Sequence, residues 1–223
     1  MPSTGIDGAV ALRRARARRL TGLYAVTPDL ADTDDLVARV AAALAGGACA
    51  IQYRNKAAEL ALRHAQASAL ARVHVTRGGL YIINDDVELA AAVGADGVHI
   101  GEDDGDVAAV RARLGTDRIL GVSCYDDFAR AETAVAAGAD YVAFGSFFAS
   151  TVKPAARRAD VRLLARARSL GVPVVAIGGI TAENAFELFA AGADAVAVIS
   201  DIFGARDVAA AARAFVPISD DRP

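Results

Sequence analysis

Short runs of apolar and β-branched residues alternate along the chain with alanine-rich stretches of helical period. The apolar runs predict eight strands, at Leu23–Val26, Ala50–Tyr53, Leu80–Ile83, Gly97–Ile100, Ile119–Val122, Tyr141–Phe144, Val172–Ile177 and Ala195–Ile199. The stretches that follow them predict helices, at Leu36–Leu44, Leu60–Val75, Val87–Val93, Val107–Leu114, Ala129–Ala137, Val161–Leu170, Ala185–Ala191 and Val208–Phe215. Uninterrupted apolar strands that alternate with helices indicate a parallel sheet covered by helices.

A Gly-Ala repeat precedes every second predicted strand. Its copies are Gly47-Ala48, Gly94-Ala95-Asp96, Gly138-Ala139-Asp140 and Gly192-Ala193-Asp194. Successive glycines are 47, 44 and 54 residues apart, which is about the length of two βα units. We interpret each glycine as the left-handed residue that ends a helix. Four pairs of units favour a closed barrel over an open doubly wound sheet. The prediction is a single α/β domain, a (β/α)8 TIM barrel over residues 21–216, with an extra N-terminal helix within residues 1–20 and a frayed tail at residues 217–223.

The composition disfavours several classes of protein. The chain has 223 residues, of which 54% are hydrophobic, and its net charge of −3 gives no reason to expect nucleic acid or a membrane as partner. Five arginines lie between Ala9 and Leu20, but no aromatic residue interleaves them, which favours an exposed helix over an RNA-binding arm. Two cysteines, no secretory pattern and no apolar run long enough to span a bilayer predict a cytoplasmic protein with reduced thiols. Monomer and homodimer both stay open.

Lysine is rare in this chain. Of the 24 basic residues only Lys56 and Lys153 are lysine, and the other 22 are arginine. Both lysines fall in loops that follow predicted strands, on the face where the active site of a β/α barrel lies. A compact ammonium and a planar guanidinium are not interchangeable at an anion site. We therefore expect both lysines to contact an anionic ligand.

Polar residues follow the second, third and fourth predicted strands. Strand alternation puts Gln52, Arg54 and Lys56 on one side, which suits a polyphosphate beside a neutral heterocycle. The acidic residues after the next two strands are Asp85, Asp86, Asp103 and Asp104. Carboxylates beside cations at a phosphate site indicate Mg²⁺, which takes one or two carboxylates together with waters and phosphate oxygens. One of Asp85 and Asp86 is expected to cap the following helix instead, and His99 is expected to be a packed barrel residue.

The later strand ends add hydroxyl groups and glycines. Ser123 can donate to a ligand, whereas Cys124 has no histidine partner nearby in the sequence, which disfavours a cysteine nucleophile. The long loop from residue 145 to 154 carries hydroxyl residues and Lys153, which suits a lid over an anion. Gly178-Gly179 and Ser200 follow the seventh and eighth strands, where such barrels bind phosphate through backbone N–H groups.

In order along the chain, these motifs resemble the thiamine phosphate synthase family. The resemblance covers residues 23–203 and rests on Gln52-x-Arg54-x-Lys56, Asn84-Asp85, Ala95-Asp96-Gly97-Val98-His99-Ile100-Gly101 running to Asp104, Gly121-Val122-Ser123, Lys153, Ala176-Ile177-Gly178-Gly179-Ile180 and Val198-Ile199-Ser200. It implies a transferase that condenses 4-amino-2-methyl-5-hydroxymethylpyrimidine diphosphate with thiazole phosphate, giving thiamine phosphate and pyrophosphate with Mg²⁺ as cofactor.

The resemblance also implies residue roles. The pyrimidine diphosphate would be held by Gln52, Arg54, Lys56, Asn84, Ser123 and Lys153, of which Arg54, Lys56, Ser123 and Lys153 are assigned to catalysis. Tyr53 and Asn55 are further candidates for substrate binding. The thiazole phosphate would be held by Ser150, Thr151, Gly179, Ile199 and Ser200. Asp85 and Asp104 would bind the metal. The chemistry needs no nucleophile or general base, because the main task is to stabilise charge on a departing pyrophosphate.

The chain departs from the family pattern at several positions. Where this chain has Glu102, the family usually has Gln, and where it has Tyr125, the family often has His. The family also usually has Pro in place of Ala149, Thr-x-Thr-Lys in place of residues 150–153, and Ala in place of Asp201. Three other functions also fit parts of this pattern: a thiazole tautomerase of the same superfamily, an unrelated phosphate-sugar isomerase or epimerase, and a non-catalytic sensor of a phosphate ligand. The tautomerase has no need of Lys56, Asp85 and Asp104 together, and the isomerase needs an acid–base pair that the sequence lacks.

Overall fold

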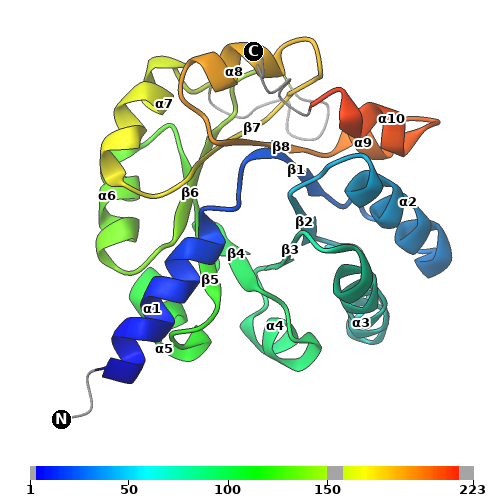
Figure 1. Ribbon diagram of the computed structural model, residues 1–223, viewed down its shortest axis with the longest axis horizontal. Helices are drawn as coiled ribbons and strands as arrows, with labels where there is room; N and C mark the ends of the chain where they lie inside the picture. The colour runs from blue at the N-terminus through cyan, green and yellow to red at the C-terminus, as the bar shows by residue number, and fades with distance from the viewer. Residues whose placement is uncertain (1–3, 150–157, 216–223) are drawn as a thin grey trace, which may run out of the picture.

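A computed structural model of the chain describes residues 4–149 and 158–215, and there eight parallel strands close into a barrel in chain order (Figure 1). The strands are β1 Gly22–Val26, β2 Ala50–Tyr53, β3 Leu80–Asn84, β4 Gly97–Ile100, β5 Ile119–Tyr125, β6 Tyr141–Gly145, β7 Val174–Ile177 and β8 Ala195–Val198. β1 pairs with both β2 and β8, which closes the sheet. The predicted TIM barrel is confirmed, with every predicted strand at its place.

Helices surround the barrel (Figure 1). They are α1 Thr4–Ala17, α2 Thr33–Ala45, α3 Leu60–Arg77, α4 Val87–Val93, α5 Val107–Leu114, α6 Phe128–Ala136, α7 Arg162–Ala167, α8 Ala185–Ala190, α9 Ser200–Phe203 and α10 Val208–Arg213. The helix predicted at 161–170 ends as a 3-10 turn at Arg168–Leu170, and α9 was not predicted. In the described ranges, no helix has both the length and the apolar character needed to cross a bilayer.

Strand alternation divides the apolar side chains into two layers. One layer fills the barrel interior and includes Tyr24, Ile82 and Tyr141, whereas the other lies between the strands and the helices and includes Tyr53 and Ile83. Because successive residues of a strand face opposite sides, the interior register also fixes which polar residues at the strand ends face inward.

The Gly-Ala repeat forms the base of the barrel, the end where the strands begin. All four glycines have positive φ, from 68° at Gly94 to 112° at Gly192, as their predicted role requires. The aspartates of the repeat have a second role, since their carboxylates accept a hydrogen bond from a backbone N–H of the preceding strand, at Tyr81, Leu120 and Val174. The first copy has Cys49 in place of the aspartate.

The N-terminal helix α1 packs against the base. The expectation of a merely exposed helix is wrong at Arg13, because its side chain is 6% exposed and its Nε lies 2.8 Å from Asp140 Oδ1. Arg111 reaches the other oxygen of Asp140 at 2.6 Å. The helix α1, which contains three of the five arginines, is therefore tied to the barrel by one buried carboxylate shared between two guanidinium groups.

Candidate active site

Three predicted site residues face the barrel interior at its mouth, the end where the strands finish. Gln52, Asn84 and Ser123 follow the inward-facing Ala50, Ile82 and Gly121 by two positions in β2, β3 and β5. The side chain of Gln52 is buried, and those of Asn84 and Ser123 are half-buried. Their inward direction follows from strand alternation, which supports the predicted contact with a ligand in the mouth.

The side chains of Tyr53 and Asn55 point away from the mouth. Tyr53 donates through its hydroxyl to Gln66 Oε1 on α3 at 2.9 Å, and burial raises the pKa of Tyr53 to about 12. Asn55 Nδ2 donates to Leu30 O at 2.7 Å and to Gln66 Oε1 at 3.0 Å. Both side chains hold the β2 loop against α3, and both residues also line the cavity described below, so their role in substrate binding stays a prediction.

The loop after β2 is fixed by residues that follow β1. Thr27 Oγ1 accepts from Arg54 N at 2.8 Å and donates to Arg54 O at 2.9 Å. Asp29 Oδ1 accepts from Lys56 N at 2.8 Å and lies 3.2 Å from the Arg54 guanidinium. Thr27 and Asp29 were not identified in the sequence, where nothing distinguishes them from other polar residues near a strand end.

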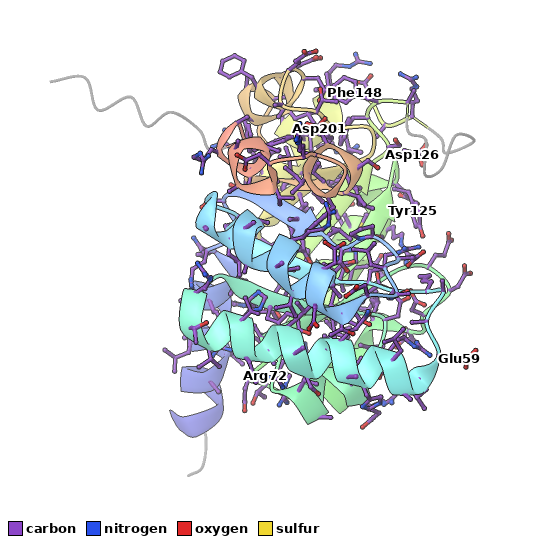
Figure 2. All side chains as sticks on the ribbon, turned by 90° about the vertical axis from the view of Figure 1, so that its right-hand side faces the viewer. Glu59, Arg72, Tyr125, Asp126, Phe148 and Asp201 are labelled. Atoms are coloured by element: carbon purple, nitrogen blue, oxygen red, sulfur yellow. The ribbon has the colours of Figure 1, made fainter. Side chains whose placement is uncertain are left out.

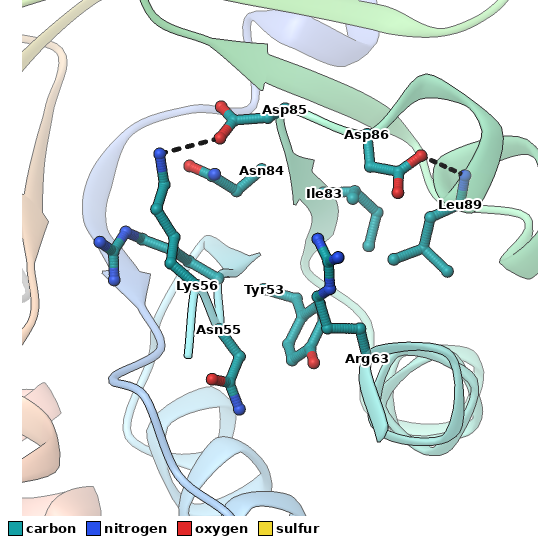
Figure 3. Close-up of a pocket in the computed structure, with 10 residues that line it drawn as sticks. Tyr53, Asn55, Lys56, Arg63, Ile83, Asn84, Asp85, Asp86 and Leu89 are labelled. Carbon is teal, nitrogen blue, oxygen red and sulfur yellow. Dashed lines mark hydrogen bonds and ion pairs between the residues drawn. The ribbon is translucent and has the colours of Figure 1, made fainter. Parts of the chain in front are cut away.

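The two aspartates after β3 have separate roles (Figure 3). Asp86 is the N-cap of α4 and accepts from Leu89 N at 2.9 Å, so the capping alternative is settled in its favour. Asp85 has a φ of 64°, a left-handed conformation that is uncommon outside glycine and often marks a functional position. Its carboxylate forms an ion pair with Lys56 Nζ at 3.1 Å.

Asp104 joins this group from the loop after β4. Its Oδ2 accepts from Gly101 N at 2.7 Å, and its carboxylate is close enough to that of Asp85 for the two to interact electrostatically. Burial and the Asp104 carboxyl group raise the pKa of Asp85. Two carboxylates this close repel each other unless a cation lies between or beside them.

This donor set fits Mg²⁺. In the described ranges no cluster of three or more His, Cys, Asp or Glu residues forms a complete protein cage for a metal ion. Mg²⁺ commonly binds to only one or two carboxylates and takes its other ligands from water and substrate phosphates. Asp85 and Asp104, with Lys56 beside them, provide that arrangement.

A cavity of about 240 Å³ lies between the loops after β2 and β3, and its lining includes a cation that no sequence motif indicates (Figure 3). Arg63 of α3 lines it together with Arg54, Lys56, Asn84 and Asp85. Arg63 Nε is buried and has no hydrogen-bond partner among the described residues. In the sequence Arg63 is one arginine among 22 and lies in a predicted helix, so only the fold brings it to the site.

The glycines after β7 allow close approach of the loop after β6. Gly178 and Gly179 have φ of 104° and 65°. A Cβ at Gly178 would overlap Ser146, and a Cβ at Gly179 would overlap Phe148 and the carbonyl of Ala149. Both positions therefore need glycine for backbone conformation and for space.

The loops after β7 and β8 are joined by one of the departures from the family pattern. Asp201 Oδ2 accepts from Ala182 N at 3.1 Å, which ties α9 to the loop that follows Gly179. Ser200 is exposed at the start of α9, and Ile199 is half-buried before it. Ser150, Thr151 and Lys153 lie outside the described residues.

Two further departures, Glu102 and Tyr125, lie at the mouth and contact each other. Tyr125 Oη accepts a long hydrogen bond of 3.4 Å from Glu102 N, and the Glu102 side chain is exposed. Figure 2 shows Tyr125 at the end of the barrel away from α1, together with Glu59 and Asp126. The Glu102 charge is therefore in solvent, in the same loop that carries Asp104.

A closed β/α barrel with cations, a carboxylate pair and a Gly-Gly turn at its mouth defines an enzyme of the phosphate-binding TIM-barrel class. A family model described as "Thiamine monophosphate synthase" matches residues 23–202. The thiamine-phosphate synthase of Chromobacterium violaceum is 57% identical over 196 residues, covering 88% of this chain and 95% of that protein. The thiamine-phosphate synthase of Bordetella pertussis is 54% identical over 200 residues, covering 86% and 92%.

A solved structure agrees with these relatives. Thiamine phosphate pyrophosphorylase from Pyrococcus furiosus superimposes with a TM-score of 0.80 at 35% identity, covering 89% of this chain and 95% of that one. The chain belongs to the thiamine phosphate synthase family. Its activity is the condensation of a pyrimidine diphosphate with thiazole phosphate. The prediction of a synthase, rather than a tautomerase, an isomerase or a sensor, is confirmed.

Proposed function

We propose that the pyrimidine diphosphate binds in the mouth with its diphosphate against Arg54, Lys56 and Arg63, and its ring over Gln52 and Ser123. The cavity beside Asn84 supports this placement, because its three cations surround a space next to the inward-facing polar residues. Lys153, which the resemblance also assigns to the diphosphate, would approach from the loop after β6. The thiazole phosphate would bind at the turns after β7 and β8, near Gly179 and Ser200.

Asp85 and Asp104 would hold Mg²⁺, which when bound neutralises charge on the diphosphate oxygens. The observation that carries this assignment is the contact of Lys56 Nζ with Asp85 at 3.1 Å, next to Asp104. A phosphate oxygen that binds to Lys56 would lie beside the two carboxylates that would hold Mg²⁺. The ammonium and the metal ligands thus act on one group of substrate oxygens.

The residues perform electrostatic work in this reaction. The bond between the pyrimidine methylene carbon and the diphosphate oxygen breaks, and its electron pair leaves with pyrophosphate. The thiazole nitrogen then gives its lone pair to the same carbon. No proton moves in either step, so Arg54, Lys56 and Arg63 need only stabilise the negative charge on the departing pyrophosphate, as preorganised cations do.

The cytoplasm is the proposed location of the protein. Two features support it: the two cysteines of the described structure are free, and the substrates are phosphorylated small molecules.

The paired variants Asp85→Asn and Asp86→Ala test the metal assignment. We expect Asp85→Asn to lower kcat by about 10²-fold or more, the size of losing one preorganised electrostatic contact, and to raise the Mg²⁺ concentration needed for half-maximal rate. Asp86→Ala should lower stability by about 1 kcal/mol through the lost N-cap and leave the Mg²⁺ requirement unchanged. Full turnover in excess EDTA, or equal kinetic effects of the two variants, would contradict the assignment.

A further inference from the structure

A continuous chain of hydrogen bonds crosses the interior of the barrel. Gln52 Nε2 donates to Tyr24 Oη at 3.0 Å, and Tyr24 Oη lies 2.9 Å from Tyr141 Oη. Tyr141 Oη lies 2.9 Å from His99 Nδ1, and His99 Nε2 lies 2.9 Å from Ser123 Oγ. The chain thus runs from β2 through β1, β6 and β4 to β5, and both of its ends are residues of the mouth.

The side chains packed around this hydrogen-bond chain exclude water, and a glycine leaves the space that one of its rings occupies. Tyr24 and Tyr141 are 1% and 0% exposed, and His99 is 7% exposed. The His99 ring stacks on Tyr141 with centroids 5.5 Å apart. Gly121 leaves the space that the Tyr141 ring fills, since a Cβ there would overlap that ring. A histidine ring that accepts a hydrogen bond at one nitrogen is neutral and carries its one N–H on the other nitrogen.

The number of hydroxyl and N–H protons available fixes which group donates in each hydrogen bond of this series. Tyr24 accepts from Gln52, and because it is buried, its own hydroxyl proton needs an acceptor, which is Tyr141. An unpaired buried hydroxyl would cost about 1–3 kcal/mol. Tyr141 then has only His99 Nδ1 to receive its proton. Since neutral His99 accepts at Nδ1, its proton is on Nε2 and is donated to Ser123.

We propose that this chain, oriented by the amide of Gln52, holds His99 as the Nε2–H tautomer and so makes Ser123 a hydrogen-bond donor to an acceptor atom of the substrate. Tyr24, Tyr141 and His99 are positioning residues, because they act through Ser123. The functional half of the inference rests on the proposed contact of Ser123 with the pyrimidine diphosphate. The tautomer of His99 does not depend on that contact.

The tautomer is measured directly by ¹⁵N NMR of the imidazole nitrogens in the full-length protein, without substrate. The protein has three histidines, and the imidazole signals that are missing from the spectrum of His99→Gln are assigned to His99. We expect the wild type to show a protonated Nε2 and an unprotonated Nδ1. Tyr141→Phe removes the donor to Nδ1 and should shift the population toward the Nδ1–H form. A wild-type proton on Nδ1, or a tautomer insensitive to Tyr141→Phe, would overturn the proposal.

Kinetics with a matched control test the consequence for Ser123. Tyr141→Phe should lower kcat/KM for the pyrimidine diphosphate by about tenfold and leave the KM for thiazole phosphate unchanged. Tyr81→Phe removes an equally buried hydroxyl, which donates to Ala67 O at 2.9 Å outside the barrel, and should leave both parameters unchanged. His99→Gln places an N–H near the Nε2 position and should keep more activity than His99→Asn. Equal losses in Tyr141→Phe and Tyr81→Phe would refute a positioning role.

Ser123→Ala separates failure of this proposal from failure of the proposed function. If Ser123→Ala has wild-type kinetics while the tautomer is as expected, the substrate contact of Ser123 is wrong and the oriented chain stands. The acceptor atom is identified by inhibition with pyrophosphate. A weaker inhibition in Ser123→Ala would place the contact on a phosphate oxygen, and unchanged inhibition with a raised KM would place it on the pyrimidine ring.

Discussion

The substitution Asp140→Asn tests how the N-terminal helix is held to the barrel. The Asp140 side chain is 1% exposed and accepts from Arg13 Nε at 2.8 Å, from Arg111 at 2.6 Å and from Leu120 N at 2.9 Å. Asparagine keeps the shape and one acceptor oxygen but removes the charge. It also turns an N–H₂ donor toward a guanidinium, so two largely buried cations lose their counter-ion.

The expected cost follows from that geometry. Removing one partner of a buried ion pair costs about 3–5 kcal/mol. Arg111 still donates to the carbonyls of Gly138, Gly115 and Arg118, and Arg13 to that of Thr116, which places the cost near the lower end, at about 3 kcal/mol. For a chain of this size that corresponds to a fall in Tm of about 6–12 °C. The mouth is at the other end of the barrel, so kcat/KM well below the Tm should not change.

The Gly-Ala-Asp repeat supplies the control. Asp194 makes the same contact with a backbone N–H, at 2.8 Å from Val174 N, but is exposed and has no ion pair within the described ranges. Asp194→Asn should therefore change the free energy of unfolding by no more than about 0.5 kcal/mol. Urea unfolding with an unchanged m-value measures both variants. If Asp140→Asn costs no more than Asp194→Asn, the buried network does not stabilise the fold as we infer.

Three further predictions concern charge and reactivity. Lys56→Arg should lower kcat/KM by about tenfold, because a planar guanidinium cannot replace the ammonium beside Asp85, and exposed Arg77→Lys should be silent. Wild-type kinetics in Lys56→Arg would show that lysine at this position has no special role. Arg63→Gln should raise the KM for the pyrimidine diphosphate and the inhibition constant of pyrophosphate several-fold without affecting the thiazole phosphate; an unchanged inhibition constant would remove Arg63 from the site. Burial raises the pKa of Cys49 to about 11 and of Cys124 to about 12, so both thiols should resist alkylation at pH 8. Rapid alkylation of either thiol at that pH would contradict the packing.

Not every arginine of this chain is a suitable control for the Lys56→Arg substitution, because some arginines make contacts of their own. Arg166 looks like a neutral choice in the sequence because it lies on a predicted helix. In the structure its guanidinium carbon lies 3.7 Å from the ring centroid of Phe128, so Arg166→Lys would weaken a cation–π contact. Arg77 makes no ion pair among the described residues and is the better control.

The sequence by itself determined the barrel and the inward direction of its polar strand ends. Apolar runs and the Gly-Ala repeat define eight units, and a period of two then places Gln52, Asn84 and Ser123 toward the interior. The same alternation could have shown that Tyr53 faces α3. The family motifs, which are local in sequence, identified the activity.

Only the tertiary structure decided contacts between residues far apart in the chain. Asp85 and Asp86 are adjacent aspartates that the sequence does not distinguish, and only the geometry at the N-terminus of α4 shows that Asp86 is the capping residue. Arg63 lines the cavity at the strand ends because α3 packs beside β3. The interior hydrogen-bond chain exists because barrel closure brings the hydroxyl groups of Tyr24 and Tyr141, which are 117 residues apart in sequence, to 2.9 Å from each other. Periodicity reports which face a residue occupies, whereas the partner on that face is fixed by how the strands close, and no local pattern encodes that.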